Sequence, residues 1–219
     1  RRFGNSVAAF ELMWDNFVQA SVQWQHLQAP FAERHPFLAL IDVDGKDEAS
    51  LRDAVEEALG EAMEAGDVVD AVIAQSQTQA KTLWKLREAP AELNTHMHPP
   101  INFDVSLPQS EIGKFADAIQ AAFDARWPGH FTLFFGHVGD GNLHVSTDGA
   151  SVRGECEAVE AELYRVVGAF HGSVSAEHGI GLHKKPFLAM SRTPAELAAM
   201  RAIKAALDPL GLMNPGKVF

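Results

Sequence analysis

The stretch of residues 131–147 reads FTLFFGHVGDGNLHVST. Two apolar segments, residues 131–137 and 142–147, flank the turn sequence Gly139-Asp140-Gly141. Asp-Gly is favoured in two-residue hairpin turns because both positions tolerate a positive φ. The stretch therefore predicts two antiparallel strands that are joined directly. A doubly wound parallel sheet needs long crossovers between its strands and would not contain this hairpin.

The same hairpin brings two histidines into register. With Asp140-Gly141 as the turn, His137 would pair with His144, and Asn142 would share their face. Directly opposed residues have Cβ atoms roughly 4.5–5.5 Å apart, a spacing that suits two imidazoles on one metal ion. A shift of one residue in the turn would break this pairing, and a histidine pair on a hairpin is more often only surface decoration.

Hydrophobic periodicity predicts the remaining elements on both sides of the hairpin. We expect strands at residues 36–45 (buried), 68–74 and 101–106, and helices at 6–24, 47–65, 75–93 (broken near Pro90), 109–126 and 151–170. Thr193-Pro194-Ala195-Glu196 is a capping box that opens a further helix. This order predicts an α+β fold of ferredoxin-like split βαβ units. Helices would cover one face of a largely antiparallel sheet, with a helical segment at the C-terminus.

The amino-acid composition excludes several classes of protein. The 219 residues carry a net charge of −11 and are 47% hydrophobic, which indicates a folded chain that is a poor ligand for nucleic acid. One cysteine, Cys156, excludes an internal disulfide, and no apolar run reaches the ~18 residues of a membrane span. We expect one continuous folded unit in the cytoplasm, with peripheral membrane attachment of the full-length protein as the alternative. The start without Met favours an excised domain of a longer protein.

A second polar cluster lies in the Gly-rich segment Ser175-Ala176-Glu177-His178-Gly179-Ile180-Gly181. Glu177 would complete a His₂-carboxylate ligand set that leaves coordination positions open, as catalytic metal sites do. His178 beside it would then act as a general base. Nothing in the spacing alone brings this cluster next to the hairpin.

Three separated segments carry a resemblance to a known family: 136–144, 176–181 and Asp208-Pro209-Leu210-Gly211-Leu212-Met213-Asn214-Pro215-Gly216-Lys217. Together with Leu86-Arg87-Glu88 and residues 104–108, they resemble the C-terminal domain of the FAD-linked oxidases, which oxidise D-lactate, glycolate or D-2-hydroxyglutarate. The resemblance implies that residues 1–219 are the substrate domain of a flavoenzyme. Its FAD-binding domain would lie N-terminal, outside this chain, which has no G-x-G-x-x-G loop.

The resemblance implies roles for seven residues. A divalent metal, Zn or Mn, would be bound by His137, His144 and Glu177; His178 would be the base; Arg87 and Asn142 would contact the substrate; and Asn214 would lie near the flavin edge. A small D-2-hydroxy acid would lose its hydroxyl proton to His178 and its C2 hydrogen, as hydride, to FAD. The other expected partner is the chain's own FAD domain, and a homodimer is compatible with this reading.

Two positions depart from the pattern of the 2-hydroxyglutarate-specific members. Where those enzymes are expected to place a Thr and a Lys, this chain has Ala91 and Asn102. The loss of a cation favours a monocarboxylate such as D-lactate or glycolate. Two alternatives from other classes stay open: a non-catalytic binding or assembly module, and a metal-dependent hydrolase on the same fold.

Overall fold

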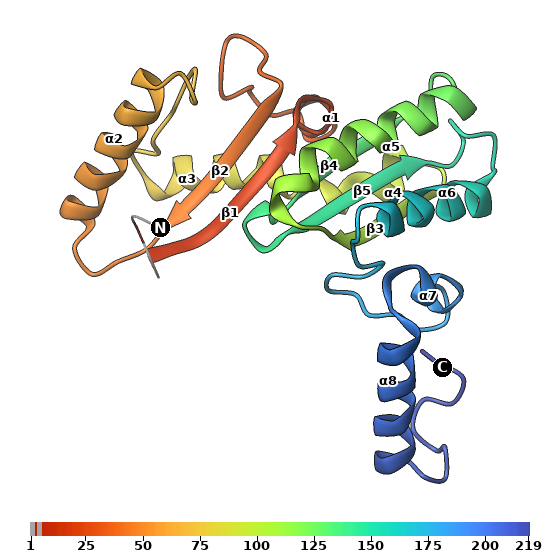
Figure 1. Cartoon of the computed structure of the whole chain (residues 1–219). Helices are drawn as coiled ribbons and strands as arrows, with labels where there is room; N and C mark the ends of the chain where they lie inside the picture. The colour runs from red at the N-terminus through yellow and green to blue at the C-terminus, as the bar shows by residue number, and fades with distance from the viewer. Residues whose placement is uncertain (1–2, 4–5) are drawn as a thin grey trace. The chain divides into compact units, whose positions relative to one another are not determined.

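The computed structural model describes residue 3 and residues 6–219 of the chain, in which helices and strands are mixed (Figure 1). The chain forms two compact units, Arg1–His96 and Met97–Phe219, where the sequence analysis expects one continuous unit. Each unit is described by itself.

The first unit combines one strand pair with helices. Its elements are β1 (Val7–Trp14), α1 (Asp15–Trp24), β2 (Phe37–Val43), α2 (Glu48–Glu64), α3 (Gln77–Arg87), the 3₁₀ turn η2 (Ala89–Glu92) and α4 (Leu93–His96). β1 and β2 are antiparallel, with Leu12 opposite Ala39. Asp47 caps α2 by accepting the N–H of Ser50 at 3.2 Å, as the sequence predicts. The break predicted near Pro90 is confirmed by η2.

Three predictions for the first unit are wrong. The predicted helix at residues 6–24 begins only at Asp15, because residues 7–14 alternate along a strand that buries Glu11 and Met13. Residues 68–74, all of them described, belong to no strand, and Val69 is 79% exposed. The predicted strand at residues 36–45 forms as β2, but it is not fully buried, since Phe37 and Ile41 are about half exposed.

The second unit holds a three-stranded antiparallel sheet in the order β4-β5-β3. Its elements are β3 (Pro100–Ser106), η3 (Gln109–Glu111), α5 (Ile112–Arg126), β4 (Thr132–Gly136), η4 (Val138–Asp140), β5 (Asn142–Asp148), α6 (Cys156–Ala169), η5 (Lys185–Phe187), α7 (Leu188–Ser191) and α8 (Pro194–Leu207). β5 lies between β3 and β4, which makes β3-α5-β4 a split βαβ unit. This confirms the predicted fold class.

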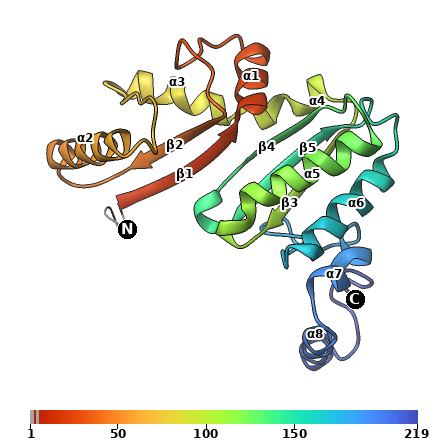
Figure 2. The same ribbon diagram turned by 45° about the horizontal axis from the view of Figure 1, so that its top comes forward.

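Helices α5 and α6 lie side by side over one face of this sheet (Figure 2). That face carries Phe103, whose ring meets the ring of Tyr164 on α6 edge-on at 5.6 Å. Because side chains alternate along a strand, Asn102 and Asp104 project to the opposite face. The helices thus leave that second face for the polar residues of the candidate site.

The hairpin register differs from the prediction. Phe135, and not His137, pairs with His144, because the turn is not the two-residue Asp140-Gly141. Residues 138–141 form the connection instead: η4 followed by Gly141 with φ +75°. A Cβ at Gly141 would lie 2.5 Å from the carbonyl oxygen of Leu107, so the close approach requires glycine.

The C-terminal part agrees more closely with the sequence. α6 begins at Cys156 rather than at residue 151, because residues 149–154 form turns first. The capping box of α8 is confirmed in both directions: Thr193 Oγ1 accepts the N–H of Glu196, and the Glu196 carboxylate accepts the N–H of Thr193. Within the described residues, none of the helices has the length and apolar character that crossing a membrane requires.

Candidate functional site

The two histidines of the hairpin converge although the predicted register is wrong. The true register is shifted by two residues, and a shift of two keeps every side chain on its predicted face. His144 stays on the face opposite the helices, and His137 follows the end of β4. Their ring centroids are 5.7 Å apart. The sequence therefore predicts the correct neighbours by way of an incorrect turn.

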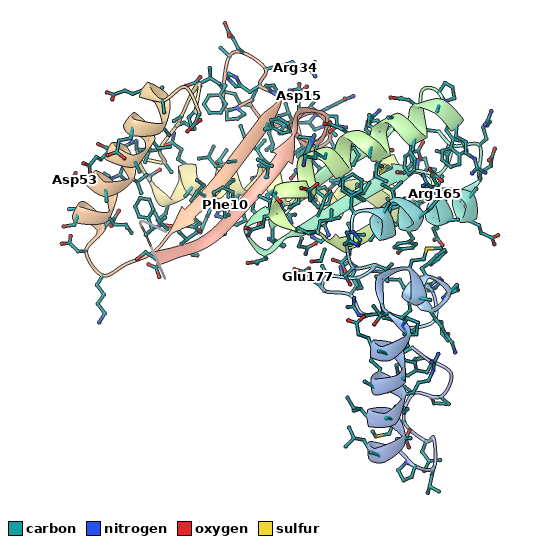
Figure 3. All side chains as sticks on the ribbon, viewed as in Figure 1. Phe10, Asp15, Arg34, Asp53, Arg165 and Glu177 are labelled. Atoms are coloured by element: carbon teal, nitrogen blue, oxygen red, sulfur yellow. The ribbon has the colours of Figure 1, made fainter. Side chains whose placement is uncertain are left out.

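Glu177 joins the two histidines from a distant segment of the chain. It lies in the loop after α6, where its exposed side chain is labelled (Figure 3). Its Oε1 is 3.7 Å from Nε2 of His137, and one ligand atom each from His137, His144 and Glu177 lies within 4.8 Å of the others. Ligands roughly 2.0–2.2 Å from one ion can be at most about 4.4 Å apart, so this cluster is close to a shared coordination sphere.

The donor set of this cluster fits a divalent ion. Two imidazole nitrogens and one carboxylate oxygen suit zinc or another first-row metal better than Mg²⁺ or Ca²⁺, which prefer oxygen ligands. Three protein ligands leave positions for substrate, as catalytic sites require. The predicted ligands are therefore brought together, and their chemistry is compatible with the ion that the sequence predicts.

Asp104 holds the Glu177 loop in place. The carboxylate is fully buried on β3, directly opposite His144 on β5. Its Oδ2 accepts the backbone N–H groups of Ala176, Glu177 and His178 at 3.2, 2.9 and 2.8 Å. Burial alone would raise the pKa of Asp104, but the N–H groups of His178 and Glu177, with the Lys184 ammonium, outweigh burial and lower it. Asp104 is therefore an ionised carboxylate inside the protein.

Lys184 is the cation that accompanies Asp104. Its Nζ donates to the Asp104 carbonyl oxygen at 3.2 Å and to Ser175 Oγ at 3.1 Å, and lies 3.5 Å from Oδ2 of Asp104. Burial lowers the pKa of Lys184, and Asp104 opposes that change. The sequence alone assigns no role to either residue. An aspartate in the middle of a predicted strand was a usable signal, whereas Lys184 has no comparable signal.

His178 reaches the same group of side chains. Its ring is stacked 6.1 Å from the ring of His144, and its Nδ1 lies 3.8 Å from Oδ2 of Asp104. Asp104, Glu177 and His178 form a second group of ligand atoms within 4.8 Å of one another. The structure thus brings His178 to the site and leaves two chemical roles open for it, base or ligand.

Asn142 is buried at the start of β5, and its side-chain nitrogen and oxygen find no hydrogen-bond partner among the described residues. A buried amide without partners costs roughly 1–3 kcal/mol, so such groups are expected to meet a ligand or water. On β3 the opposed residue is Ser106. This is compatible with the substrate contact that the sequence predicts for Asn142.

Arg87 and Asn214 lie in other parts of the chain. Arg87 belongs to the first unit, where its Nε donates to Oε2 of the buried Glu11 at 2.6 Å. Asn214 lies in the exposed C-terminal loop, with a positive φ of 46°. That loop meets the segment after Glu177, because Val218 donates its N–H to the Gly181 carbonyl at 3.0 Å and Lys185 donates to the Gly216 carbonyl at 2.9 Å. The two C-terminal motifs are therefore neighbours.

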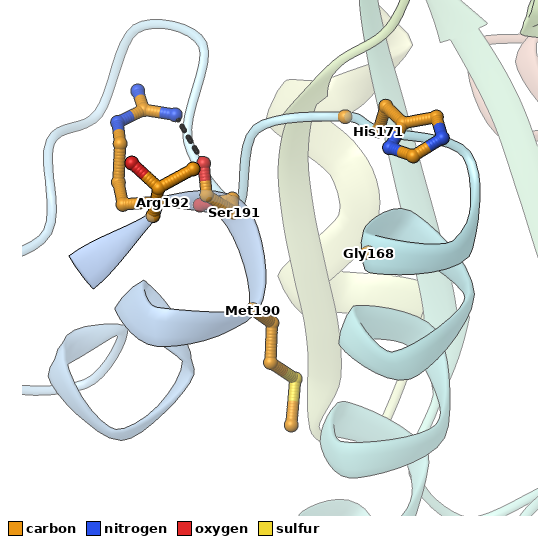
Figure 4. Close-up of a pocket in the computed structure, with 7 residues that line it drawn as sticks. Gly168, His171, Met190, Ser191 and Arg192 are labelled. Carbon is orange, nitrogen blue, oxygen red and sulfur yellow. Dashed lines mark hydrogen bonds between the residues drawn. The ribbon is translucent and has the colours of Figure 1, made fainter. Parts of the chain in front are cut away.

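A separate pocket lies where α6 ends and α7 turns into α8 (Figure 4). Among its polar lining residues is Arg192, which donates to the Ser191 carbonyl at 2.7 Å and to Ser173 Oγ at 3.4 Å. None of the seven predicted site residues lines it. The pocket adds nothing to the histidine–carboxylate cluster.

The sheet belongs to an α+β fold in which ligand atoms of two imidazoles and a carboxylate lie within 4.8 Å of one another, beside a buried amide that has no partner among the described residues. The chain belongs to the family of FAD-linked oxidases, C-terminal domain, whose model matches residues 1–218. This confirms the resemblance on which the expected site is based.

Curated relatives align with almost the whole chain. It is 37% identical to a D-2-hydroxyglutarate dehydrogenase of Stutzerimonas stutzeri (97% of this chain, 47% of the relative) and 41% identical to one of Xanthomonas citri pv. viticola (96% and 45%). It is 32% identical to a putative mitochondrial D-lactate dehydrogenase of Schizosaccharomyces pombe (96% and 42%). The chain thus spans a little less than half the length of these relatives.

A solved structure agrees on the fold. The 4-ethylphenol oxidase of Gulosibacter chungangensis, in its isoeugenol complex, superposes with a TM-score of 0.58 at 16% identity, over 96% of this chain and 47% of that one. At this identity the likeness concerns the fold alone.

Proposed function

We propose that this chain is the substrate-binding half of a flavoenzyme that oxidises a D-2-hydroxy acid to the 2-oxo acid. The observation that carries the proposal is the convergence of His137, His144 and Glu177, with His178 and Asn142 beside them, on one side of the sheet. The names of the relatives point to the same reaction class. The other half, which binds FAD, would be supplied by the remainder of the protein.

The oxidation removes two electrons and two hydrogens from the C2 carbinol and leaves a carbonyl. Zn²⁺ or Mn²⁺ on His137, His144 and Glu177 would supply Lewis acidity to the hydroxyl. The His178 imidazole takes the hydroxyl proton as a general base. The FAD held by the remainder of the protein would supply the acceptor for the C2 hydrogen and its electron pair.

Three further residues orient the reactants in this proposal. The Arg87 guanidinium holds the C1 carboxylate, because its planar fork matches a carboxylate in two parallel hydrogen bonds. The buried amide of Asn142 gains substrate as its hydrogen-bond partner. Asn214, in the loop that Val218 attaches to Gly181, would contact the flavin edge.

Two substrates are candidates, and each has its own support. D-2-Hydroxyglutarate is favoured by the names of the relatives that are 37% and 41% identical. D-Lactate or glycolate is favoured by Asn102, which projects to the site face and accepts a hydrogen bond from Ser146 at 2.8 Å where a second carboxylate would need a cation. The cytoplasmic location stays a prediction, since several relatives are named mitochondrial.

The test is reduction of the flavin in the full-length enzyme under anaerobic conditions. D-2-Hydroxyglutarate, D-lactate and glycolate are mixed in turn with the enzyme, with L-2-hydroxyglutarate and L-lactate as controls. The proposal expects loss of visible flavin absorbance with at least one of the first three and not with the L-acids. Comparison of kcat/KM then ranks the two candidate substrates. Retention of the flavin absorbance with all of the acids would refute the proposed reaction.

A further inference from the structure

Asp104 differs from the ligands of the cluster because it is fully buried and its hydrogen bonds converge on one oxygen. Oδ2 accepts three successive backbone N–H groups, those of residues 176–178, and the hydroxyl of Ser175 at 3.1 Å. Successive N–H groups point at one anion only when the backbone curls around it, as in anion-binding nests. Here the anion belongs to the protein, on a neighbouring strand of the sheet.

The backbone curl around Asp104 fixes the starting direction of two side chains, those of Glu177 and His178. Glu177 and His178 each donate their N–H to Asp104, so the directions of their Cα–Cβ bonds are fixed relative to β3. β3 is in turn paired with β5, which carries His144 opposite Asp104. The loop of residues 175–178 would otherwise be a connection whose exposed side chains have no rigid element beneath them.

We propose that Asp104 is a positioning residue that, with Lys184, sets Glu177 for metal binding and His178 for proton transfer. The inference rests on the proposed function. The outer partners of metal ligands typically account for 10–100-fold in metal affinity or activity. In this protein the outer partner is Asp104, and it accepts a hydrogen bond from the backbone N–H of the ligand Glu177 rather than from its side chain.

A second role for Asp104, as a ligand of another ion with Glu177 and His178, is disfavoured by charge. The ammonium of Lys184 lies 3.5 Å from Oδ2 of Asp104, so a cation already neutralises this carboxylate. A divalent ion on the same carboxylate would be repelled by Lys184. Metal stoichiometry distinguishes the two roles: positioning expects one ion per chain, and two ions would overturn it.

The experiment compares Asp104→Ala and Asp104→Asn with Asp148→Ala in the full-length enzyme. Asp148 is a matched control, because it also accepts backbone N–H groups, from His98 at 2.6 Å and Ser151 at 2.9 Å. It lies four residues along β5 from His144, about 13 Å at the usual strand rise. The affinity for Zn²⁺ or Mn²⁺ is measured by competition with a chelator at a temperature where each variant is folded, alongside Tm, KM and kcat.

We expect Asp104→Ala to weaken metal binding 10–100-fold and to lower kcat more than it changes KM. Asp104→Asn keeps an oxygen for the three N–H groups and should recover part, but not all, of that affinity. Asp148→Ala should lower Tm and leave the affinity within about threefold of the wild type. If Asp104→Ala does not fold, Asp104→Asn carries the test and must weaken the affinity at least threefold against Asp148→Asn.

Wild-type metal affinity in folded Asp104→Ala would overturn the positioning role, and so would equal losses in Asp104→Ala and Asp104→Asn. Failure of the proposed function looks different. In that case the wild-type enzyme itself binds no ion, or His144→Ala binds it as tightly as the wild type does. The outcomes that overturn positioning are therefore read only in an enzyme whose His144→Ala variant loses the ion.

Discussion

Asp104 and His144 are directly opposed on the antiparallel strands β3 and β5, which places a buried carboxylate beside one of the two site histidines on the same face of the sheet. The carboxylate draws in the loop of Glu177 and His178, and the histidine lies beside His137. His144 and Glu177 are 33 positions apart in the sequence. Strand β3, through Asp104, brings their two segments together.

The turn between β4 and β5 gives a first prediction. Gly141→Ala should lower the free energy of unfolding by about 1–3 kcal/mol, because φ is +75° and the new Cβ would meet the Leu107 carbonyl. Gly154→Ala is the control, with the same φ but no atom within 4 Å of the new Cβ. Denaturant unfolding measures both. Equal losses in the two variants would show that the contact with Leu107 is unimportant.

The hairpin also shows how far the sequence could predict the site. Alternation keeps His137 and His144 on one face for any even-numbered shift of the turn, so this histidine pair was predictable and the register was not. The position of Glu177 beside the pair has no signal in the spacing. The turn depends on the close approach of Gly141 to Leu107, a tertiary contact without a sequence signal. The sequence predicts a helix at residues 7–14 because they are apolar with few charges and run on into α1. The burial of Glu11 on a strand depends on its ion pair with Arg87, a tertiary contact that the local pattern does not show. Residues 68–74 do not form the predicted strand. They are mostly apolar, but a strand also needs a neighbouring strand for its backbone hydrogen bonds, and the local sequence does not supply one.

Asp208 gives a pH dependence. Its Oδ1 accepts the N–H of Leu212, and its Oδ2 accepts the N–H of Met213 and a hydrogen bond from Lys204. Lys204, and after it the N–H of Met213, lowers the pKa of Asp208 below its ordinary value of 3.8. A carboxyl with a lowered folded pKa stabilises the loop above the ordinary value, and this stabilisation is lost as the pH falls through the folded pKa.

Cleavage of residues 209–214 by pepsin should therefore increase as the pH falls below about 4. Asp208→Asn should show rapid cleavage already at the upper end of the range in which pepsin is active. Asp117→Asn, at an exposed position on α5, is the control. Cleavage of the wild type that does not change with pH would contradict the role of Asp208.

Arg87 gives a kinetic prediction for the full-length enzyme. Arg87→Lys should raise KM and lower kcat/KM for D-2-hydroxy acids, because the ammonium of lysine cannot form the two parallel hydrogen bonds of the guanidinium. The fall in kcat/KM should correspond to a loss of roughly 1.5–3 kcal/mol of transition-state stabilisation. Lys85→Arg, at an exposed position of the same helix, should leave the kinetics unchanged. Tm is recorded as well, since Arg87 also pairs with Glu11. Unchanged kinetics in Arg87→Lys would remove Arg87 from the site.

The proposed division of the protein into an FAD-binding half and this half predicts the colour of the isolated chain. Purified residues 1–219 should be colourless after incubation with FAD and gel filtration, because the sequence has no Gly-rich pyrophosphate loop. Visible absorbance measures this directly. A yellow preparation with one FAD per chain would show that this half binds the flavin by itself.

The most direct test of the central claim is the metal content of the full-length enzyme and its His144→Ala and His178→Ala variants, measured with turnover on the same samples. The account predicts one divalent ion per wild-type chain, loss of both ion and turnover in His144→Ala, and retention of the ion in His178→Ala. Turnover of His178→Ala should fall by about 10²–10⁴-fold, as expected for the loss of a general base. Loss of the ion from His178→Ala, or full turnover of a metal-free His144→Ala, would contradict it.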